Sequence, residues 1–475
     1  MEIISRKKEL AIFDRLIKSP ESEFLAVYGR RRVGKTYLIR EALSSKITFE
    51  CTGLMDANKD DQLLNFWITL SKIHDIPVIP PNAWLKAFQY LEDYLNTLKP
   101  SKGKKKVVFF DEISWYDTAR SGFLPAFTQF WNSYCSKQKD ILLIICGSAA
   151  SWIIGKVINS RGGLHNRLTQ TIRLEAFDLQ ETNEYLRYRK VKLSEKDIAQ
   201  LYMCLGGIPY YLKLVSNGQS IPQILDALFF DKEASLKGEF LNLYASLFKN
   251  HHLHTTVVEA LTKSAKGLTR EQIIKATKLG SGGGLTTILN ELEECGFVIK
   301  TRDFDKRKED GLFRLMDEFT LFYFKFMVSK NDMKSGVYLY NSHAFKTWSG
   351  FAFENLCFRH HHKIAKALGF SGIQYQYYSF VDKGAADSRG AQIDLIIDRA
   401  DNVINIIEAK FYLARLVINK AMALNIADKI EALRRKTKTK KNIFVTLITA
   451  MGVEKNEYYL SWITNDLEIE DFNNL

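Results

Sequence analysis

Short apolar runs followed by glycine or polar residues mark the first third of the chain. The segments 24–28 (FLAVY), 107–110 and 141–146 have the length and composition of buried strands. A helical pattern follows the first of them after a glycine-containing loop, which is the strand, loop, helix order of an α/β unit. Parallel strands that end in polar residues line a ligand crevice at their carboxyl ends. We therefore predict an α/β fold with a parallel sheet here.

Helical periodicity dominates the middle of the chain. Residues 176–240 are expected to form helices around the turn LGGIPYYL (205–212), which has the outline of a helical lid. Three further short helices are predicted at 252–264, 269–279 and 285–295. The apolar segments 297–299 and 312–315 then flank a charged loop, so this region has a winged-helix outline.

The last part of the chain predicts a second α/β domain. The aromatic segment 319–328 is expected to pack between domains, and the polar stretch 329–336 is a candidate linker. Beyond it, periodicity predicts helices at 350–368 and 413–435 and strands at 392–398, 403–410 and 443–449.

Composition and charge narrow the class of protein. Its 475 residues are enough for about three domains, and the six cysteines are far apart, which favours reduced, buried thiols over a zinc or disulfide framework. The N-terminus has no apolar signal region, and the longest apolar run, 141–146, is far shorter than the roughly 20 residues that span a bilayer. We expect a cytoplasmic protein without a membrane partner. A net charge of +13 favours a polyanionic partner over a merely solvated surface.

The segment GRRRVGKT satisfies the phosphate-loop pattern GxxxxGK[ST]. Glycines let successive backbone N–H groups point at phosphate oxygens, and the following helix presents its positive end to them. Lys35 is predicted to reach the β- and γ-phosphates of ATP, and the Thr36 hydroxyl to hold Mg²⁺. The predicted nucleotide-contacting residues are Gly29, Arg30, Arg31, Arg32, Val33, Gly34, Lys35, Thr36 and Tyr37.

Two further strand ends supply the hydrolytic groups. Asp111 and Glu112 follow the apolar run of KVVFFDEIS, where Asp111 is predicted to join the Mg²⁺ shell and Glu112 to polarise the attacking water. Ser148, at the end of the third run, is either a γ-phosphate contact or an ordinary turn serine. Arg167 is a candidate for stabilising transition-state charge, from within the chain or from a neighbouring molecule. Arg173 lies nearby, and the sequence does not choose between the two arginines.

These residues carry a family resemblance. Arg6 with Glu9, GRRRVGKT, FFDE, CGSAASW, NRLT and LGGIPYYL look like the archaeal-type ATPases of the STAND branch of the AAA+ group, over roughly residues 1–240. The resemblance implies an AAA+-like core with a helical lid and hydrolysis used as a switch or motor. It also implies that Gly206 and Pro209, in the lid turn, lie near the nucleotide.

The winged-helix outline has an unfavourable charge for DNA reading. Its expected recognition helix carries Glu291, Glu293 and Glu294 and no basic residue. Only the wing tip is basic, with Lys306, Arg307 and Lys308, and neighbouring acids offset it. We therefore favour an inter-domain or regulatory role over sequence-specific recognition.

A second candidate site lies near the C-terminal end. In QIDLIIDRADNVINIIEAKF, period-two alternation puts Glu408 and Lys410 on one face, and a turn centred on Asp401 puts Asp394 across from Glu408. Two carboxylates and a lysine suit metal-assisted phosphodiester hydrolysis with Mg²⁺ or Mn²⁺. With Glu354 as a third ligand, these residues resemble the PD-(D/E)xK nuclease superfamily, whose fold is that of restriction endonucleases.

Two basic features accompany this second site. The run RRKTKTKK (434–441) is either a phosphate-backbone contact or a solvated loop. His360, His361 and His362 point in successive directions around a helix, so we interpret them as surface residues rather than metal ligands.

Four domains follow from these patterns: a P-loop ATPase core at 1–175, a helical lid at 176–245, a winged helix at 250–330 and a nuclease-like domain at 337–475. We expect an ATP-hydrolysing ATPase that gates a metal-dependent nuclease acting on nucleic acid, with DNA favoured over RNA and a homo-oligomer as a further expected partner state. The alternative is a STAND-type signalling ATPase whose C-terminal domain binds without cleaving. A transcription regulator working through the winged helix is disfavoured by its acidic helix.

Overall fold

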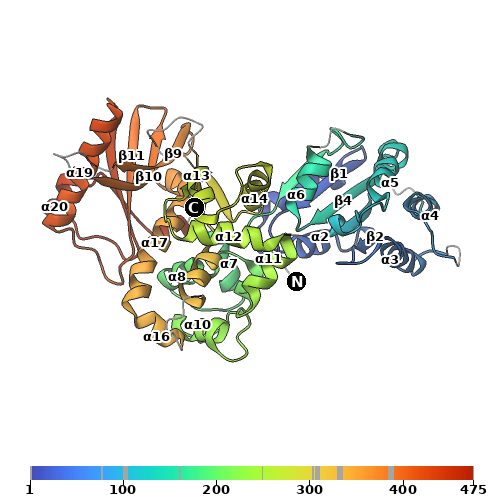
Figure 1. Ribbon diagram of the computed structural model, residues 1–475, viewed down its shortest axis with the longest axis horizontal. Helices are drawn as coiled ribbons and strands as arrows, with labels where there is room; N and C mark the ends of the chain where they lie inside the picture. Colours follow the sequence, from blue (N-terminus) through green and yellow to red (C-terminus); the bar gives the residue numbers. More distant parts are fainter. Residues whose placement is uncertain are drawn as a thin grey trace. The chain divides into compact units, whose positions relative to one another are not determined.

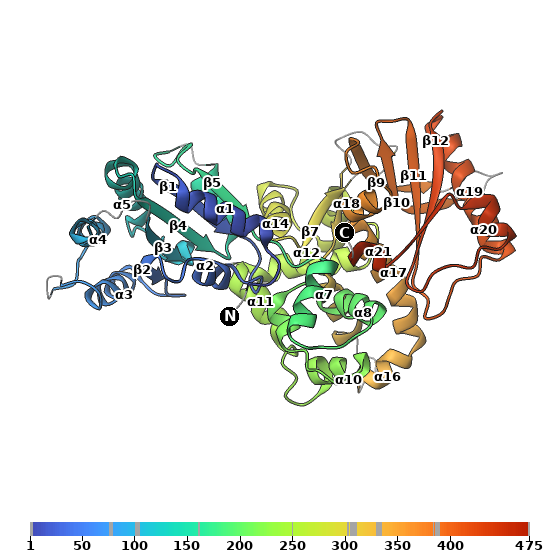
Figure 2. The ribbon, with the colours of Figure 1, turned by 180° about the vertical axis from the view of Figure 1, so that it is seen from behind.

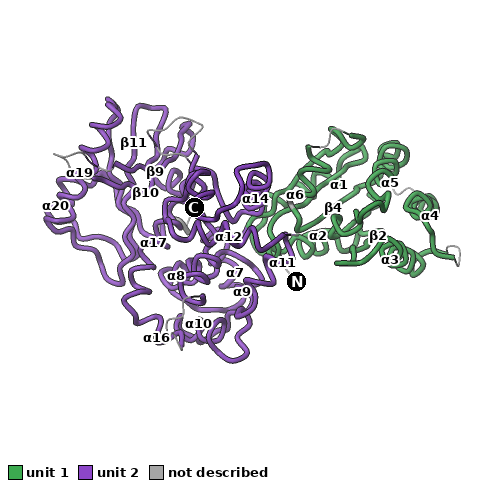
Figure 3. Tube along the Cα trace, in the orientation of Figure 1, with its two compact units in different colours: residues 1–175 green, residues 176–475 purple. Residues whose placement is uncertain are grey.

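A computed structural model describes residues 3–75, 79–99, 105–159, 162–248, 250–301, 304, 311–328, 335–382, 384 and 390–473. The chain divides into two compact units, Met1–Glu175 and Ala176–Leu475, which Figure 3 colours green and purple. The expected wing tip (Lys306, Arg307, Lys308) and most of the candidate linker lie outside the described residues.

The first unit is an α/β layer structure around one parallel sheet (Figure 1). Its five strands are β1 (Glu23–Tyr28), β2 (Ile47–Thr52), β3 (Lys106–Asp111), β4 (Ile141–Gly147) and β5 (Gln170–Arg173), in the order β2-β3-β4-β1-β5. Every neighbouring pair is parallel, which confirms the predicted fold class of this part. Its helices are α1 (Lys7–Lys18), α2 (Lys35–Leu43), α3 (Lys59–Ser71), α4 (Trp84–Thr97), α5 (Phe123–Gln129) and α6 (Ala150–Ile153).

An aromatic core covers one face of this sheet. Alternate strand residues, among them Phe24, Phe110 and Ile145, are buried in one cluster with residues of α3, α4 and α5. Residues between them in sequence are equally buried on the opposite face, as expected for a parallel sheet that is covered on both sides. The rigid sheet fixes the loops at its carboxyl edge, where the candidate nucleotide residues lie.

The second unit begins with helices and a small antiparallel sheet. The helices around the expected lid turn are α7 (Leu179–Tyr188), α8 (Glu195–Leu205), α9 (Pro209–Lys213), α10 (Ile221–Leu225) and α11 (Glu239–Leu247). They are followed by α12 (His251–Thr262), β6 (Leu268–Thr269), α13 (Arg270–Thr277), α14 (Gly283–Glu294), β7 (Val298–Thr301) and β8 (Leu312–Leu315). The three strands pair in the order β6-β8-β7. Both groups of elements occur where the periodicity predicted them.

The second unit ends with a mixed five-stranded sheet. Its strands are β9 (Tyr375–Asp382), β10 (Ala391–Arg399), β11 (Val403–Lys410), β12 (Asn442–Thr449) and β13 (Asn465–Glu468), in the order β13-β12-β11-β10-β9. The β10–β11 hairpin pairs Leu395 with Ile407, which confirms the predicted register. The helices of this part are α16 (Gly336–Asn341), α17 (His343–Arg359), α18 (His361–Ala367), α19 (Lys420–Thr437), α20 (Glu457–Trp462) and α21 (Glu470–Asn473). Figures 1 and 2 both show α19 lying against this sheet.

The long helix α19 begins seven residues later than the predicted start at 413. The Asn419 side chain accepts the backbone N–H of Met422 and caps the helix there. The segment before it is held instead by a bridge between Leu416 and Val453, which sequence periodicity could not reveal.

The aromatic segment forms α15 (Glu318–Phe322) and a π-helical turn (Tyr323–Met327), in which Val328 N–H donates to the Tyr323 carbonyl. Phe319 lies 4.9 Å from Tyr211 of α9, between ring centroids, and Phe322 lies 5.6 Å from Trp348 of α17. The segment thus packs between α9 and α17, which belong to the same compact unit; its expected place between domains stays a prediction.

The prediction that His360, His361 and His362 are surface residues is wrong for the first two. His360 is buried, its Nδ1 donates to the Leu356 carbonyl, and its Nε2 accepts the backbone N–H of Leu179 on α7. Burial lowers the pKa of His360 to about 3, so the ring is neutral. His361 stacks on Tyr377, with 3.8 Å between the ring centroids. These partners are distant in sequence, which is why helical spacing alone misplaced the histidines.

The six cysteines are free and buried, as predicted. Among the described residues, none of the helices combines the length and apolar character that crossing a membrane requires.

Gly207 offers a test of the packing at the lid turn. A Cβ atom there would lie 1.8 Å from the Phe177 carbonyl oxygen, and the Phe177 N–H donates to the Gly207 carbonyl at 2.7 Å. We expect Gly207→Ala to destabilise the second unit by about 2 kcal/mol or more, because backbone must move. Gly372, whose Cβ position is open, is the matched control and should change stability by less than about 0.5 kcal/mol as Gly372→Ala. Urea denaturation followed by fluorescence measures both, and equal midpoints would contradict the packing.

Candidate functional site

The phosphate loop joins the end of β1 to the start of α2. The predicted residues Gly29, Arg30, Arg31, Arg32 and Val33 form this loop, and Gly34 stands at the N-cap of α2 with φ 90°. That left-handed conformation suits glycine and turns the chain so that the first N–H groups of α2 point into the loop. Thr36 lies in the first turn of α2, and Tyr37 beside it is 42% exposed. The loop therefore has the backbone of an anion-binding site.

Lys35 is the buried cation of this loop. Its Nζ atom donates to the carbonyls of Gly29 and Arg30, both at 2.9 Å, and to Ser148 Oγ at 3.1 Å. The side chain is only 5% exposed, so its charge depends on these three oxygens. Ser148 is thus brought to the loop from the end of β4, and its predicted contact with the γ-phosphate stays a prediction.

Glu112 is held beside Ser148 from the end of β3. The Ser148 backbone N–H donates to Glu112 Oε2 at 3.0 Å, and the Ser148 hydroxyl donates to Oε1 at 2.8 Å. The Glu112 backbone has φ 46° and ψ 52°, a left-handed conformation that is uncommon for a non-glycine residue. Strain of this kind costs about 1–3 kcal/mol and is found at functional sites. The carboxylate is thereby fixed one serine away from the Lys35 ammonium.

Asp111 faces the first turn of α2. Thr36 Oγ1 donates to its carboxylate at 3.0 and 3.1 Å from the two oxygens, and the Glu112 N–H donates to it at 3.1 Å. Burial and then the charge of Glu112 raise the pKa of Asp111, while the Thr36 bond opposes the rise. A hydroxyl and a carboxylate in contact are oxygen donors of the kind that Mg²⁺ prefers, so these residues fit the predicted metal position.

The candidate arginines lie at opposite ends of one strand, β5, which is an edge strand of the sheet. Arg173 ends β5 and pairs in register with Tyr28, next to the phosphate loop. Arg167 precedes β5, and the nearby Thr169 N–H donates to the Phe24 carbonyl near the start of β1. Arg167 therefore lies near the start of β1, whereas the loop follows the end of that strand, so the structure does not bring Arg167 to the loop of its own chain. Its other predicted role, toward a neighbouring molecule, stays a prediction.

Gly206 and Pro209 lie in the second unit, at the turn between α8 and α9. Gly206 has φ 66°, and Pro209 is the first residue of α9. Their predicted place near the nucleotide stays a prediction.

The C-terminal candidates gather around a pocket of about 380 Å³. Glu354 of α17, Asp394 of β10 and Lys410 of β11 line it, together with Gln392 and residues of α19. Gln392 Nε2 donates to Asp394 Oδ1 at 2.6 Å. Three elements that are separate in sequence thus converge, as the sequence predicted for Glu354, Asp394 and Lys410.

Glu408 is buried and already paired with two lysines, so its carboxylate is not available to a metal ion in this structure. It is 5% exposed, lies 3.5 Å from Lys410 Nζ, and accepts a hydrogen bond from Lys429 of α19. Among the described residues, no group of three or more histidine, cysteine, aspartate or glutamate side chains is arranged to hold a metal ion. The structure therefore does not support the predicted set Glu354, Asp394 and Glu408 as an assembled metal site. Lys429 was missed because no motif links it to the hairpin.

Charges around this pocket shift the pKa values of its groups. Burial and then Asp394 raise the pKa of Glu354 to about 7, although Lys410 and Arg314 oppose the rise. Burial lowers the pKa of Lys410, but the charges of Glu408, Glu354 and Asp394 outweigh it, and the pKa is raised. Burial lowers the pKa of Arg314 to about 10, and the nearby charges of Asp394 and Glu354 oppose this decrease. A buried carboxyl group with a strongly raised pKa in a pocket, as Glu354 has, is a common feature of functional sites.

Some side chains of the basic run 434–441 form ion pairs with acidic residues of the same domain fold. Arg435 pairs with Asp382, and Lys441 lies 2.6 Å from Asp398.

The acidic helix α14 makes an internal contact through Glu291. Its carboxylate lies 2.7 Å from the ring of the buried His254, so Glu291 is paired within the protein.

The parallel sheet, the glycine loop and the paired acids define the fold of a P-loop ATPase. Residues 3–215 match a family model described as an ATPase domain predominantly from Archaea, so this part of the chain is an archaeal-type ATPase domain.

Individual relatives are distant. Over 402 residues, 83% of each chain, the protein is 23% identical to an uncharacterized protein of Methanocaldococcus jannaschii. Among solved structures, a Walker-type ATPase of Pyrococcus abyssi is 16% identical with a TM-score of 0.49, over 68% of this chain and 96% of that one. The ORC2 protein of Aeropyrum pernix is 15% identical with a TM-score of 0.42, over 68% and 93%.

Removing the Lys35 ammonium tests the phosphate loop. We expect Lys35→Ala to weaken ATP binding at least about tenfold, because a charged hydrogen-bond donor to phosphate is lost. The exposed Lys46, just after α2, is the matched control, and Lys46→Ala should bind ATP as the wild type does. Calorimetric titration with ATP and Mg²⁺ measures both affinities. Equal affinities would show that the phosphates do not lie at Lys35.

The raised pKa of Glu354 predicts a pH-dependent stability. Because the folded protein binds this proton more tightly than the unfolded chain, stability is present at low pH and falls as pH rises through about 7. Glu354→Gln removes the buried charge and should stabilise the protein at pH 8 by on the order of 1–3 kcal/mol, with little effect at pH 4.5. Denaturant midpoints at both pH values measure this. Glu431→Gln, at an exposed position on α19, is the control. A stabilisation that does not change with pH would refute the assignment.

Proposed function

We propose that this protein uses ATP hydrolysis to control a nucleic-acid-processing site in its C-terminal pocket. One hydrogen-bond network supports the ATPase part of this proposal. In it, Lys35 donates to Ser148 and Ser148 donates to Glu112, while Thr36 donates to Asp111 beside them. Together they supply a hydrogen-bond donor for phosphate, an orienting hydroxyl, a base and two metal ligands at the carboxyl ends of neighbouring strands.

Each residue has a role that its contacts support. On binding a triphosphate, Lys35 would exchange the Gly29 and Arg30 carbonyls for phosphate oxygens. Thr36 and Asp111 would hold Mg²⁺, which supplies neutralisation of phosphate charge. Glu112 would orient and deprotonate a water molecule, and Ser148, now bonded to both Lys35 and Glu112, would sense the γ-phosphate between them.

The second half of the proposal concerns the fold and chemistry of the last residues. We propose that α12 to β8 are a winged helix and that 337–475 form a nuclease-like domain of the PD-(D/E)xK type. The antiparallel hairpin that carries Asp394, Glu408 and Lys410, and the convergence of Glu354 and Asp394 on one pocket with Lys410, support this. For cleavage, Glu408 would have to leave Lys429, so that a cation could take the lysine's place.

Contacts within the second unit support coupling between the two halves. The matched ATPase region extends to residue 215 and so includes α7 and α8, which lie in the second unit. Lys363 of α18 lies 3.1 Å from Asp178, at the N-cap of α7, and His360 accepts the Leu179 N–H. Arg359, at the end of α17, pairs with Glu318, whose carboxylate would lie 3.1 Å from a Cβ on Gly206. A movement of the lid turn would therefore act directly on the helix that carries Glu354.

A second candidate function is a STAND-type signalling ATPase whose C-terminal pocket binds nucleic acid or protein without cutting it. The pairing of Glu408 with Lys410 and Lys429 favours it, because both lysines neutralise the acid that a metal would need.

A cleavage assay separates these functions. With ATP and Mg²⁺ or Mn²⁺, we expect the wild type to cleave DNA and Lys410→Ala to lose cleavage by about 100-fold or more while its ATPase rate is unchanged, since Lys410 is remote in sequence and belongs to the other unit. Lys420→Ala, at the exposed start of α19, is the control for lost positive charge. Nucleotide-dependent binding without cleavage of single- or double-stranded DNA or RNA would favour the signalling function instead.

A further inference from the structure

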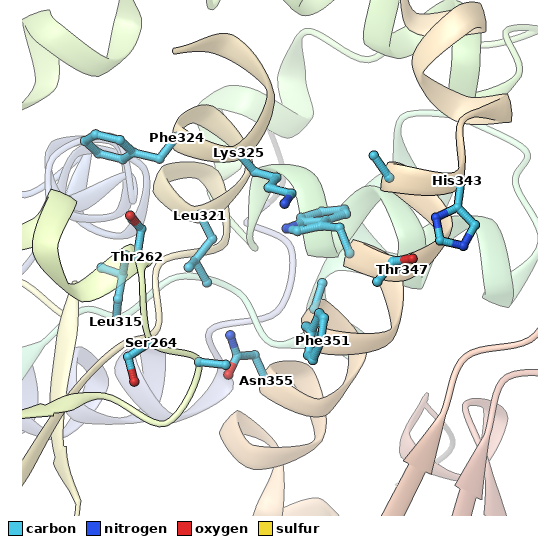
Figure 4. Close-up of a pocket in the computed structure, with 14 residues that line it drawn as sticks. Thr262, Ser264, Leu315, Leu321, Phe324, Lys325, His343, Thr347, Phe351 and Asn355 are labelled. Carbon is cyan, nitrogen blue, oxygen red and sulfur yellow. The ribbon is translucent and has the colours of Figure 1, made fainter. Parts of the chain in front are cut away.

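A mainly apolar pocket of about 490 Å³, here called the apolar pocket, lies beside α17 within the second unit (Figure 4). Its walls come from the end of α12, from β8, from α15 with its π-helical turn, and from one face of α17. Its largest apolar side chains are Leu315, Leu321, Phe324, Trp348 and Phe351. Small-ligand sites usually have about 300–1,000 Å³ and apolar walls with a few polar groups, so this pocket has the size and the lining of such a site.

Two hydrogen-bond donors lie at the buried floor of the apolar pocket. Trp348 is 7% exposed, and its indole N–H donates to no residue in the part of the chain that the structure describes. Asn355 is 6% exposed, and its Oδ1 accepts a hydrogen bond from Arg314. This bond directs the amide nitrogen toward the space between α15 and α17 (Figure 4), where none of the described residues accepts from it. Donors in such a place require an oxygen acceptor from outside the chain.

The mouth of the apolar pocket carries a positive charge. Lys325 is exposed and extends from the π-helical turn toward α17 (Figure 4), and its ammonium forms no ion pair or hydrogen bond with any described residue. His343 and Thr347 of α17 are exposed at the same mouth. Among the described residues that line the pocket, none is an aspartate or a glutamate. A ligand anion would therefore meet a cation here without meeting a like charge.

This positive mouth lies away from the carboxylates of the C-terminal pocket. The residue after Lys325 is Phe326, whose ring lies 5.8 Å from that of Phe345 and 5.3 Å from that of Trp348, between centroids. Lys325 is thus attached beside the first half of α17, whereas Glu354 is in the second half. A helical rise of about 1.5 Å per residue puts Phe345 and Glu354 about 13–14 Å apart along the axis. An anion at the mouth is therefore attracted by Lys325 more strongly than it is repelled by Glu354.

We propose that the apolar pocket binds a small carboxylic acid with a flat apolar body. The body lies against Trp348 and Leu315, the carboxylate accepts from the Lys325 ammonium at the mouth, and an oxygen on the body accepts from Asn355. A single lysine matches one negative charge better than the several charges of a nucleotide, which favours a carboxylic acid over a nucleoside phosphate. The inference goes beyond the proposed function, because its ligand is neither ATP nor nucleic acid.

The first test compares methoxynaphthylacetate, which has a flat apolar body with a carboxylate and an ether oxygen, with the corresponding neutral amide. Calorimetric titration of the full chain measures both affinities. We expect the wild type to bind the acid about 3- to 10-fold more tightly than the amide, because an exposed ammonium gives a modest charge contribution. Lys325→Met should lose this preference and bind the amide as before. Lys346→Met, at an exposed position of α17 that does not line the pocket, is the matched control and should keep the preference.

A second variant tests the location of the ligand. Ala352 is 7% exposed and lines the apolar pocket, so Ala352→Leu fills part of its space and should weaken the binding of both compounds by about tenfold or more. A thermal unfolding midpoint close to that of the wild type shows that this variant is folded. If it is not folded, Lys325→Met still decides, because its side chain is exposed.

Four results would overturn the inference. They are equal binding of acid and amide by the wild type, a preference that persists in Lys325→Met, wild-type affinity for both compounds in folded Ala352→Leu, and binding of neither compound at millimolar concentration. The last result would leave an apolar peptide as the occupant to test.

Discussion

The buried ammonium group of Lys35 is the interaction on which the nucleotide edge of the first unit depends. An isolated charge at 5% exposure would be very unfavourable, and three oxygens from the loop and from β4 compensate for its lost hydration. Because Ser148 also binds Glu112, the same cation indirectly aligns the end of β3. In the proposed function, a phosphate that displaces the two carbonyls would change the surroundings of Ser148 and Glu112 together. Nucleotide binding and hydrolysis would then be linked through this one buried charge.

Local patterns were enough to predict the parts of the molecule that depend on neighbours in sequence. The phosphate loop, the strand that ends at Asp111 and the β10–β11 hairpin each carry their signal within about twenty residues, and each occurs as predicted. Residues whose environment comes from distant segments were not predictable in this way. His360 is buried because α7 supplies a backbone N–H, and Lys429 reaches Glu408 from a helix that follows the hairpin. Arg167 lies near the start of β1, and not near its end, because β5 runs parallel to β1; the sequence alone left its role open.

Helix α17 connects features that the sequence presented as separate. One side of it packs on the five-stranded sheet, where Phe353 lies 5.3 Å from Phe411 between ring centroids. Another side carries Trp348 and Asn355 toward α15, and its last residues are bound to Glu318 and, through His360, to α7. A helix that is fixed at its end and carries Glu354 in its middle has little freedom to move independently. If α7 to α9 act as the lid of the proposed function, a change in their position would reach α17 through these contacts.

The π-helical turn after α15 has an evolutionary consequence. A π turn contains one residue more than an α turn, and each residue advances an α-helix by about 100°. In this frame both Phe324 and Lys325 line the apolar pocket. A homologue shortened by a single codon within 323–327 would regain regular α geometry, and the residues that follow would rotate by that angle. Such a deletion would remove one residue and turn those that follow, so it would change the pocket's wall without substituting any other side chain and would offer a lineage a one-step route to a different ligand preference.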